Sequence, residues 1–228
     1  MGYTLITANR NYSSWSLRPW LLMQALGIPF VDRVEPFVDT VSYDTFRRFS
    51  PTGQVPVLLD GTRTVWDSLA IALYLAERHD GVWPADEAVR AWAQAAVAEM
   101  HGGFGALRSN CTMNVGVRVR PNPFSAEVTR DIARLAELWG EGLARFGGPF
   151  LAGADFTAAD AFYAPVVYRV RTYGLEVGSA GGAWVQRMLA HPAMRNWEAA
   201  ALAETWRDLA HEAELASCGT VIEDHRAR

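Results

Sequence analysis

The first eighty residues alternate between strand-like and helix-like patterns of apolar side chains. Short runs of β-branched and aromatic residues are separated by segments whose apolar residues recur every three or four positions. The Asp60-Gly61 pair between two such runs is typical of a hairpin turn. The order β-α-β-α-β-β-α predicts a small α/β domain over residues 1–80. Its predicted elements are strand 3–8, helix 15–27, strand 28–37, helix 42–51, strand 55–61, strand 62–67 and helix 67–79.

The pattern changes after residues 81–86, which we interpret as a linker. From there to the end, over residues 87–228, we find only helical spacing, so the second domain is predicted to be an all-α helical bundle. The apolar residues that step by three or four positions include Val89, Trp92, Ala96, Met100, Phe104, Leu107, Val128, Ile132, Leu135 and Leu138.

The later part of this second domain has its own start and stop signals. Thr157 and Asp160 have the spacing of a capping box, which predicts a helix start. Shorter helices are expected at 182–190 and 193–203. The tail from Trp206 is polar, and its last residues are expected to be mobile.

Composition and charge exclude several classes of function. Half of the 228 residues are apolar and 20% are charged, which is typical of a globular protein. All 21 cationic side chains are arginine, so a Walker-type phosphate lysine, a Schiff-base lysine and a lysine general base are excluded. The net charge of -4 is spread evenly along the chain, which argues against nucleic acid as a partner.

Cysteine usage and apolar runs predict the compartment. Cys111 and Cys218 lie far apart with no metal-type spacing, and the five histidines show none either, so no metal site or disulfide framework is predicted. No basic start with an apolar core opens the chain, and no apolar run reaches the ~20 residues that cross a bilayer. We therefore expect a cytoplasmic protein without a membrane partner.

Three short segments of the first domain carry the candidate chemistry. Residues 12–14 lie between the first strand and the first helix, Val55-Pro56 begins the third strand, and Asp67-Ser68 begins the third helix. Helix N-termini and the carboxyl ends of strands attract anionic ligands, because unpaired N–H groups and the helix dipole favour negative charge there. The three segments together predict one joint binding site.

These segments resemble those of the cytosolic glutathione transferases. The resemblance rests on the element order, on SPTGQVPVL at 50–58, on the acid-serine pair at 67–68 and on FTAADA at 156–161. The run from Ser13 to Arg18 is similar to the SSC-x-x-R start of the zeta class, with Trp15 where that class often has cysteine. The resemblance covers about residues 3–205. It implies a thioredoxin-like first domain, glutathione as co-substrate without a metal, a role in detoxification, and a homodimer.

The resemblance also implies which residues bind and activate glutathione. Ser13, five positions before Arg18, matches the serine that donates a hydrogen bond to the glutathione sulfur and favours its thiolate. Ser14 is expected at the helix N-cap, where it can act as a cap only or as the activating residue. The Val55-Pro56 bond is expected to be cis, which turns the Val55 backbone toward the cysteinyl part of glutathione.

The remaining contacts implied by the resemblance lie at the two ends of glutathione and in the electrophile site. Asp67 pairs with the γ-glutamyl ammonium, and the Ser68 hydroxyl and backbone N–H bind the γ-glutamyl carboxylate. Gln54 meets the glycyl carboxylate. Arg108 hints at an acidic co-substrate, although a solvated cluster with Arg118 and Arg120 explains it as well. The candidate electrophile-site residues are Tyr12, His101, Phe104, Arg108, Met113, Asn114 and Trp206.

Three functions stay open on these grounds. The first is a glutathione transferase that adds the thiolate to a small electrophile. The second is a glutathione-dependent cis-trans isomerase of a maleyl-type diacid, prompted by the zeta-like serines. The third is a binding or scaffold protein that keeps the fold without turnover.

Overall fold

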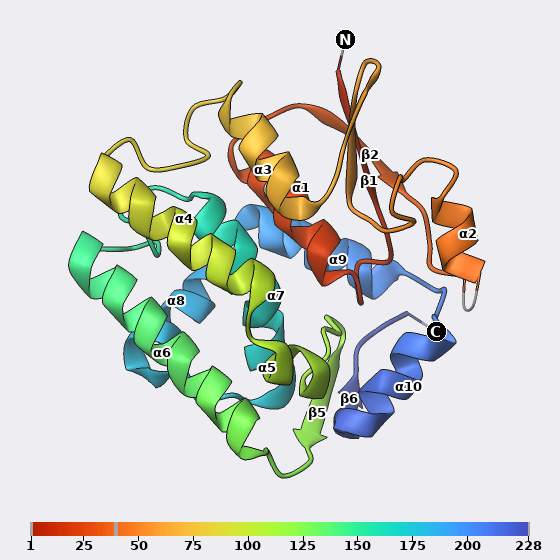
Figure 1. The fold of residues 1–228 in the computed structure, drawn as a ribbon. Helices are drawn as coiled ribbons and strands as arrows, with labels where there is room; N and C mark the ends of the chain where they lie inside the picture. Colours follow the sequence, from red (N-terminus) through yellow and green to blue (C-terminus); the bar gives the residue numbers. More distant parts are fainter. Residues whose placement is uncertain (1, 39–40, 228) are drawn as a thin grey trace.

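The computed structural model describes residues 2–38 and 41–227, so the outer ends of both predicted domains, residues 1 and 228, lie outside the described residues. The first domain contains a mixed sheet of strand order β2-β1-β3-β4 (Figure 1). β1 pairs parallel with β2 and antiparallel with β3, and β3 pairs antiparallel with β4. Its elements are β1 (Tyr3–Thr7), α1 (Ser14–Ala25), β2 (Phe30–Val34), α2 (Ser42–Phe46), β3 (Val57–Asp60), β4 (Arg63–Val65) and α3 (Ser68–Ala76).

The predicted order of the first domain is confirmed, including the hairpin turn. Asp60 pairs with Arg63 across the turn, and Gly61 has a φ of 59°. That left-handed conformation is open to glycine at little cost, which explains why an Asp-Gly pair forms the turn.

The second domain is a helical bundle that packs against the first domain through α1. Both α7 and α9 contact α1, and Figure 1 shows α9 running behind α1 and the sheet. Nearly every residue of α7 is buried, and the fully buried Trp139, Trp184 and Trp197 fill the bundle around it. The helices are α4 (Glu87–Gly102), α5 (Gly105–Asn110), α6 (Ala126–Phe146), α7 (Ala158–Tyr173), α8 (Gly178–Ala190), α9 (Pro192–Ala203) and α10 (Leu209–Cys218).

The predicted capping box is present at the start of α7. Thr157 accepts from the backbone of Ala159, and the Asp160 carboxylate accepts from the N–H of Thr157 and of Leu151 and from the indole of Trp184. Asp160 is completely buried, and this burial raises its carboxyl pKa to about 6 despite the three donors.

The prediction that the second domain is purely helical is wrong in one place. β5 (Val117–Pro121) pairs antiparallel with β6 (Gly219–Asp224), and α10 leads into β6. The alternation of valine and arginine at 117–120 is a strand signal that was hidden within a long stretch of helical spacing. The tail beyond Trp206 therefore forms a helix and a strand rather than a loose extension, because β6 adds to β5.

The helical spacing that runs from Val89 to Leu107 in the sequence is also interrupted in the structure. α4 ends at Gly102, Phe104 adopts a left-handed φ of 55°, and α5 starts at Gly105. The consecutive glycines at 102 and 103 weaken the helix at this point. Over residues 2–38 and 41–227, no helix is long and apolar enough to cross a membrane. In the same ranges, no three His, Cys, Asp or Glu side chains are grouped as metal ligands.

Candidate functional site

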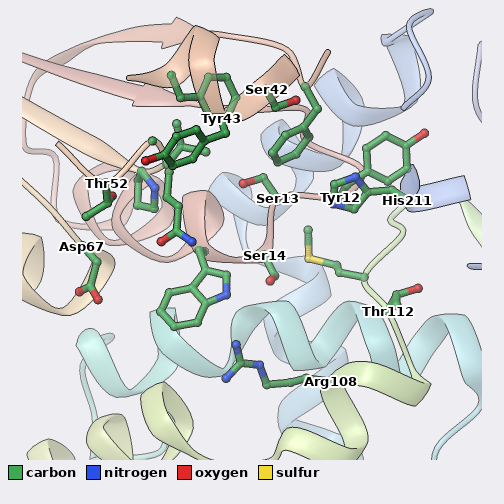
Figure 2. Close-up of a pocket in the computed structure, with 18 of the residues that line it drawn as sticks. Tyr12, Ser13, Ser14, Ser42, Tyr43, Thr52, Asp67, Arg108, Thr112 and His211 are labelled. Carbon is green, nitrogen blue, oxygen red and sulfur yellow. The ribbon is translucent and has the colours of Figure 1, made fainter. Parts of the chain in front are cut away.

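A cavity of about 1330 Å³ lies between the two domains (Figure 2). Single drug-sized ligands occupy pockets of about 300–1000 Å³, so this cavity has room for two ligands side by side. One wall comes from the first domain and the other from the second domain and the tail. The first-domain wall consists of Tyr12, Ser13, Ser14, Trp15, Phe37, Ser42, Tyr43, Phe46, Thr52, Gly53, Gln54, Val55, Pro56, Trp66, Asp67 and Ala70. The second-domain wall consists of Gly105, Arg108, Ser109, Thr112, Met113, Arg169, His211 and Glu214.

The loop that carries the two serines is held by the second domain. The N–H of Arg10 donates to the Glu204 carboxylate at 2.7 Å, and the Asn11 amide donates to the Ala201 carbonyl at 2.6 Å. The Trp197 indole donates to the Arg10 carbonyl at 3.0 Å. These bonds run from the end of α9 to the loop, so α9 fixes the position at which α1 starts.

Helix α1 begins one residue earlier than the sequence suggests, which changes the places of the two serines in the helix. α1 begins at Ser14, so Ser13 is the N-cap residue, and its side chain makes no capping hydrogen bond. The Ser13 hydroxyl instead donates to the Ser16 hydroxyl at 2.7 Å, and the N–H of Ala8 donates to the same Ser16 oxygen at 3.3 Å. The prediction of Ser14 as the N-cap is therefore wrong, and both serines lie in the cavity wall.

The second and third candidate segments meet the serines at the same cavity. The Val55-Pro56 peptide bond is cis, as expected, and both residues line the wall. Asp67 is the N-cap of α3, where it accepts from the N–H of Leu69 at 2.9 Å and of Ala70 at 3.4 Å. About half of its side chain remains exposed, and its second oxygen, Oδ2, lies 3.3 Å from Nε2 of His101.

Arginine side chains gather beside the second-domain wall without matching carboxylates. Burial, followed by the charges of Arg108 and Arg169, lowers the pKa of Arg18 to about 9. Burial and the charge of Arg108 lower the pKa of Arg169 to about 10. Among the described residues, none of the three guanidinium groups has a carboxylate within 4.0 Å. Arg18 and Arg108 instead contact the Trp15 ring, at 4.3 and 4.9 Å from its centroid.

The tail closes the far end of the cavity. Tyr12 donates its hydroxyl to Glu212 of α10 at 2.7 Å, and Glu212 also accepts from the Arg226 guanidinium at 2.5 Å. The pKa of Tyr12 is strongly raised, first by burial and then by this carboxylate. In Figure 2 the His211 ring lies beside Tyr12, and both residues line the cavity.

Comparison with protein-family models assigns both halves of the chain. Residues 12–78 match the N-terminal domain of glutathione S-transferase, and residues 122–200 match its C-terminal domain. Together these segments make up more than half of the chain. The chain belongs to the glutathione S-transferase family. The resemblance found in the sequence and the predicted fold class, a thioredoxin-like domain followed by a helical domain, are thereby confirmed.

Curated relatives match only part of this glutathione S-transferase chain. Over 61 residues it is 44% identical to a dichloromethane dehalogenase of Methylorubrum extorquens, which covers 26% of this chain and 21% of that protein. Over 130 residues it is 28% identical to a zeta class glutathione S-transferase of Euphorbia esula, which covers 56% of this chain and 58% of that protein. The chain thus spans about a fifth of the length of the dehalogenase and less than two thirds of the zeta class protein.

A solved structure supports the fold over almost the full length. The theta class glutathione S-transferase of Xanthomonas axonopodis pv. citri, with glutathione bound, superposes with a TM-score of 0.64 at 22% identity. The superposition covers 90% of this chain and 99% of that one. At this level of identity, the similarity concerns the fold.

The cavity contains many, but not all, of the residues expected from the resemblance to glutathione transferases. Tyr12, Ser13, Ser14, Gln54, Val55, Pro56, Asp67, Arg108 and Met113 lie in its wall. Ser68, His101, Phe104, Asn114 and Trp206 do not.

The residues outside the wall have structural contacts that explain their position. Ser68 is buried behind the wall, where Arg18 donates to its hydroxyl at 3.4 Å. His101 lies 3.3 Å from the Asp67 carboxylate, and burial lowers its pKa. Phe104 packs on Tyr163 in the core. Trp206, a candidate for the electrophile site, is exposed and lies outside the wall, and α10 supplies His211 and Glu214 instead.

Sequence reasoning missed the wall residues from distant elements. Arg169 comes from the buried helix α7, where an arginine has no local signal of function. His211 looks like a surface histidine because α10 itself was not expected. Arg108 lies with Arg18 and Arg169 rather than with Arg118 and Arg120, which belong to β5. His211 and Glu212 are followed by Ala, Glu and Leu, with leucine at the place of the second histidine, so no HExxH motif marks the tail.

Proposed function

We propose that this chain is a glutathione transferase that activates bound glutathione as the thiolate and adds it to a small electrophile. The observation that carries the proposal is the meeting of three segments at one cavity. Ser13 and Ser14 at the start of α1, Val55 before β3 and Asp67 at the start of α3 all lie in its wall. This is the set of positions at which the resemblance expects glutathione to bind.

Each segment has a chemical role in the proposed reaction. Ser13 donates a hydrogen bond to the sulfur, with Ser14 as the alternative donor, and the open N–H groups of α1 add to the stabilisation of the negative charge. The Val55 backbone pairs with the cysteinyl unit in the manner of a strand. Asp67 binds the γ-glutamyl ammonium through its half-exposed carboxylate, and Gln54 binds near the glycyl carboxylate.

Binding to immobilised glutathione tests the proposed site. Asp67→Asn removes the charge that binds the ammonium but retains a side chain that caps α3 well, so retention should fall about tenfold or more while stability changes little. Asp86→Asn is the matched control, because Asp86 caps α4 with the same geometry, at 2.9 and 3.0 Å from the N–H of Ala88 and Val89, outside the cavity wall. Equal retention of both variants would count against the site.

Turnover is tested separately, with a panel of electrophiles and free glutathione. A chain that binds glutathione but consumes none of it with any electrophile, and isomerises no diacid, is a binding or scaffold protein. The expected result is consumption of glutathione in proportion to product, with the loss of a halide or the opening of a strained ring.

A second candidate reaction is favoured by two arginines that line the cavity and donate to backbone carbonyls but have no carboxylate partner among the described residues. Arg108 and Arg169 reach the cavity wall without a carboxylate partner among the described residues, and an acidic substrate supplies the missing negative charge. This favours the glutathione-dependent cis-trans isomerisation of a maleyl-type diacid. Isomerisation consumes no glutathione, so measuring free glutathione during the reaction separates the two candidates.

The assembly and the compartment belong to the same proposal. A homodimer is what the family resemblance implies, and Leu73, which is 48% exposed on the first domain, is an apolar side chain that such an interface would cover. We also propose that the protein acts in the cytoplasm, where its two free thiols, Cys111 and Cys218, stay reduced.

A further inference from the structure

The tail places an imidazole in the cavity wall and holds it with a buried carboxylate. His211, on the first turn of α10, lines the cavity. Its Nδ1 lies 2.5 Å from Oδ2 of Asp208, whose side chain is only 3% exposed. The same oxygen accepts from the backbone N–H of His211 at 3.1 Å. An imidazole whose Nδ1–H is bound to a carboxylate has its other nitrogen, Nε2, available for proton transfer.

The ring of His211 is also fixed by two aromatic neighbours. It stacks on Tyr12, with ring centroids 5.0 Å apart and an interplanar angle of 19°. Phe37 contacts it with a centroid distance of 4.6 Å. Tyr12 directly precedes Ser13 in the chain, so the imidazole lies next to the segment that contains the proposed thiol-activating serine. A surface histidine that served only to cap a helix needs neither contact.

The charged groups near His211 come from the tail. Glu212 is occupied by Tyr12 and Arg226, and Glu214 lies in the cavity wall one turn along α10. Phe37 adds no charge. Asp208 therefore makes the direct contact with the imidazole, and this contact fixes the orientation of the ring.

We propose that His211 is the proton donor of the electrophile site and that Asp208 positions it. This inference rests on the proposed transferase function. When the thiolate attacks an epoxide, a C–S bond forms, the C–O bond breaks and its electron pair stays on oxygen. Nε2 of the protonated His211 gives its proton to that oxygen. The imidazole then takes up a proton from water, which balances the proton that glutathione lost when its thiol ionised.

Displacement of a halide needs no such donor. The thiolate forms the C–S bond, the carbon–halogen bond breaks, and the halide leaves as a stable anion. A residue that only donates a proton therefore matters for one class of electrophile and not for the other. A residue that only supports the cavity affects both classes alike.

The test compares styrene oxide with benzyl chloride, two electrophiles of similar size that react at a benzylic carbon. His211→Gln should lower the rate with styrene oxide about 100-fold and leave the rate with benzyl chloride within about threefold, since general acid catalysis contributes about 10²–10⁴-fold. Asp208→Asn should change the ratio of the two rates in the same direction and by less. Both rates are measured on the same sample of each variant. A loss of folded protein lowers the two rates by the same factor and leaves their ratio unchanged.

The control variant is His225→Gln. His225 is an exposed histidine beside Glu223, at 2.9 Å, outside the cavity wall, and its replacement should leave both rates unchanged. An equal loss with both electrophiles, or no loss with either, would overturn the role of His211. A chain that converts benzyl chloride but not styrene oxide would also overturn it while leaving the proposed transferase function standing. A chain that converts neither would overturn both.

Discussion

Replacing Ser13 by alanine tests the proposed activation of the thiol. The Ser13 side chain is nearly buried, lies in the cavity wall and donates to Ser16 at 2.7 Å. To activate glutathione, the hydroxyl turns from Ser16 to the sulfur. Ser16 keeps a partner when this happens, because the N–H of Ala8 also donates to its oxygen. The Ser13 hydroxyl therefore exchanges one acceptor, the Ser16 oxygen, for another, the sulfur, and stays hydrogen-bonded throughout.

The magnitude follows from the energy of one hydrogen bond to an anion. A hydroxyl that donates to a charged acceptor contributes about 1.5–3 kcal/mol, and one pKa unit corresponds to about 1.4 kcal/mol. Losing the Ser13 hydroxyl should therefore raise the pKa of bound glutathione by about one to two units. Binding through Asp67 and Val55 does not involve this hydroxyl, so the affinity for glutathione should change little.

The measurement is the ultraviolet absorbance of the thiolate in the glutathione complex, titrated from about pH 5 to 10. Ser14→Ala is the matched variant, because Ser14 also lines the cavity but makes no N-cap in the structure. A shift in Ser14→Ala and none in Ser13→Ala would transfer the role to Ser14. If neither variant shifts the thiol pKa, the N–H groups of α1 alone stabilise the thiolate and the reasoning about the serines is refuted.

Further predictions concern stability, substrate charge and assembly. The buried Asp160 has a folded pKa of about 6 against about 3.9 when unfolded, so its contribution to stability is full below pH 4 and is lost as the pH rises toward 6. The unfolding free energy of the wild type relative to Asp160→Asn should fall by about 2 kcal/mol between pH 4 and 7 in urea titrations, and a constant difference would contradict this. Arg108→Gln should raise the KM for a maleyl-type diacid about tenfold or more and leave that for an uncharged electrophile unchanged, whereas Arg118→Gln on β5 should alter neither. Sedimentation should show a dimer at micromolar concentration, and a species of 25.2 kDa alone would exclude it.

The order of elements in the first domain was predictable because each element carries a local signal. Strand 3–7, helix 14–25 and the Asp-Gly hairpin follow from the spacing of apolar residues and from turn chemistry, which depend on neighbours in the chain. The capping box at Thr157 is local in the same sense. The short strand β5 was missed because five residues of alternating pattern do not stand out within long helical spacing.

The details of the candidate site depended on the tertiary structure. Local pattern located the start of α1 to within one residue, whereas the hydrogen bonds that hold the loop before α1 come from Trp197, Ala201 and Glu204, about 190 positions away. Deciding which candidate side chains face the cavity requires knowing how α3, α4 and α5 pack. That packing buries Ser68 and Phe104 and leaves Arg108 in the wall.

By itself the sequence determined the α/β and helical halves of the chain and the residues that resemble a glutathione-binding segment, because these depend on periodicity and short motifs. Only the tertiary structure brought Arg18 of α1 together with Arg169 of α7, and His211 of α10 together with Tyr12. These pairs are separated by about 150 to 200 positions, as the hydrogen bond from Tyr12 to Glu212 is by 200. Contacts at such separations come from the packing of helices around one core, and no spacing within the chain encodes them.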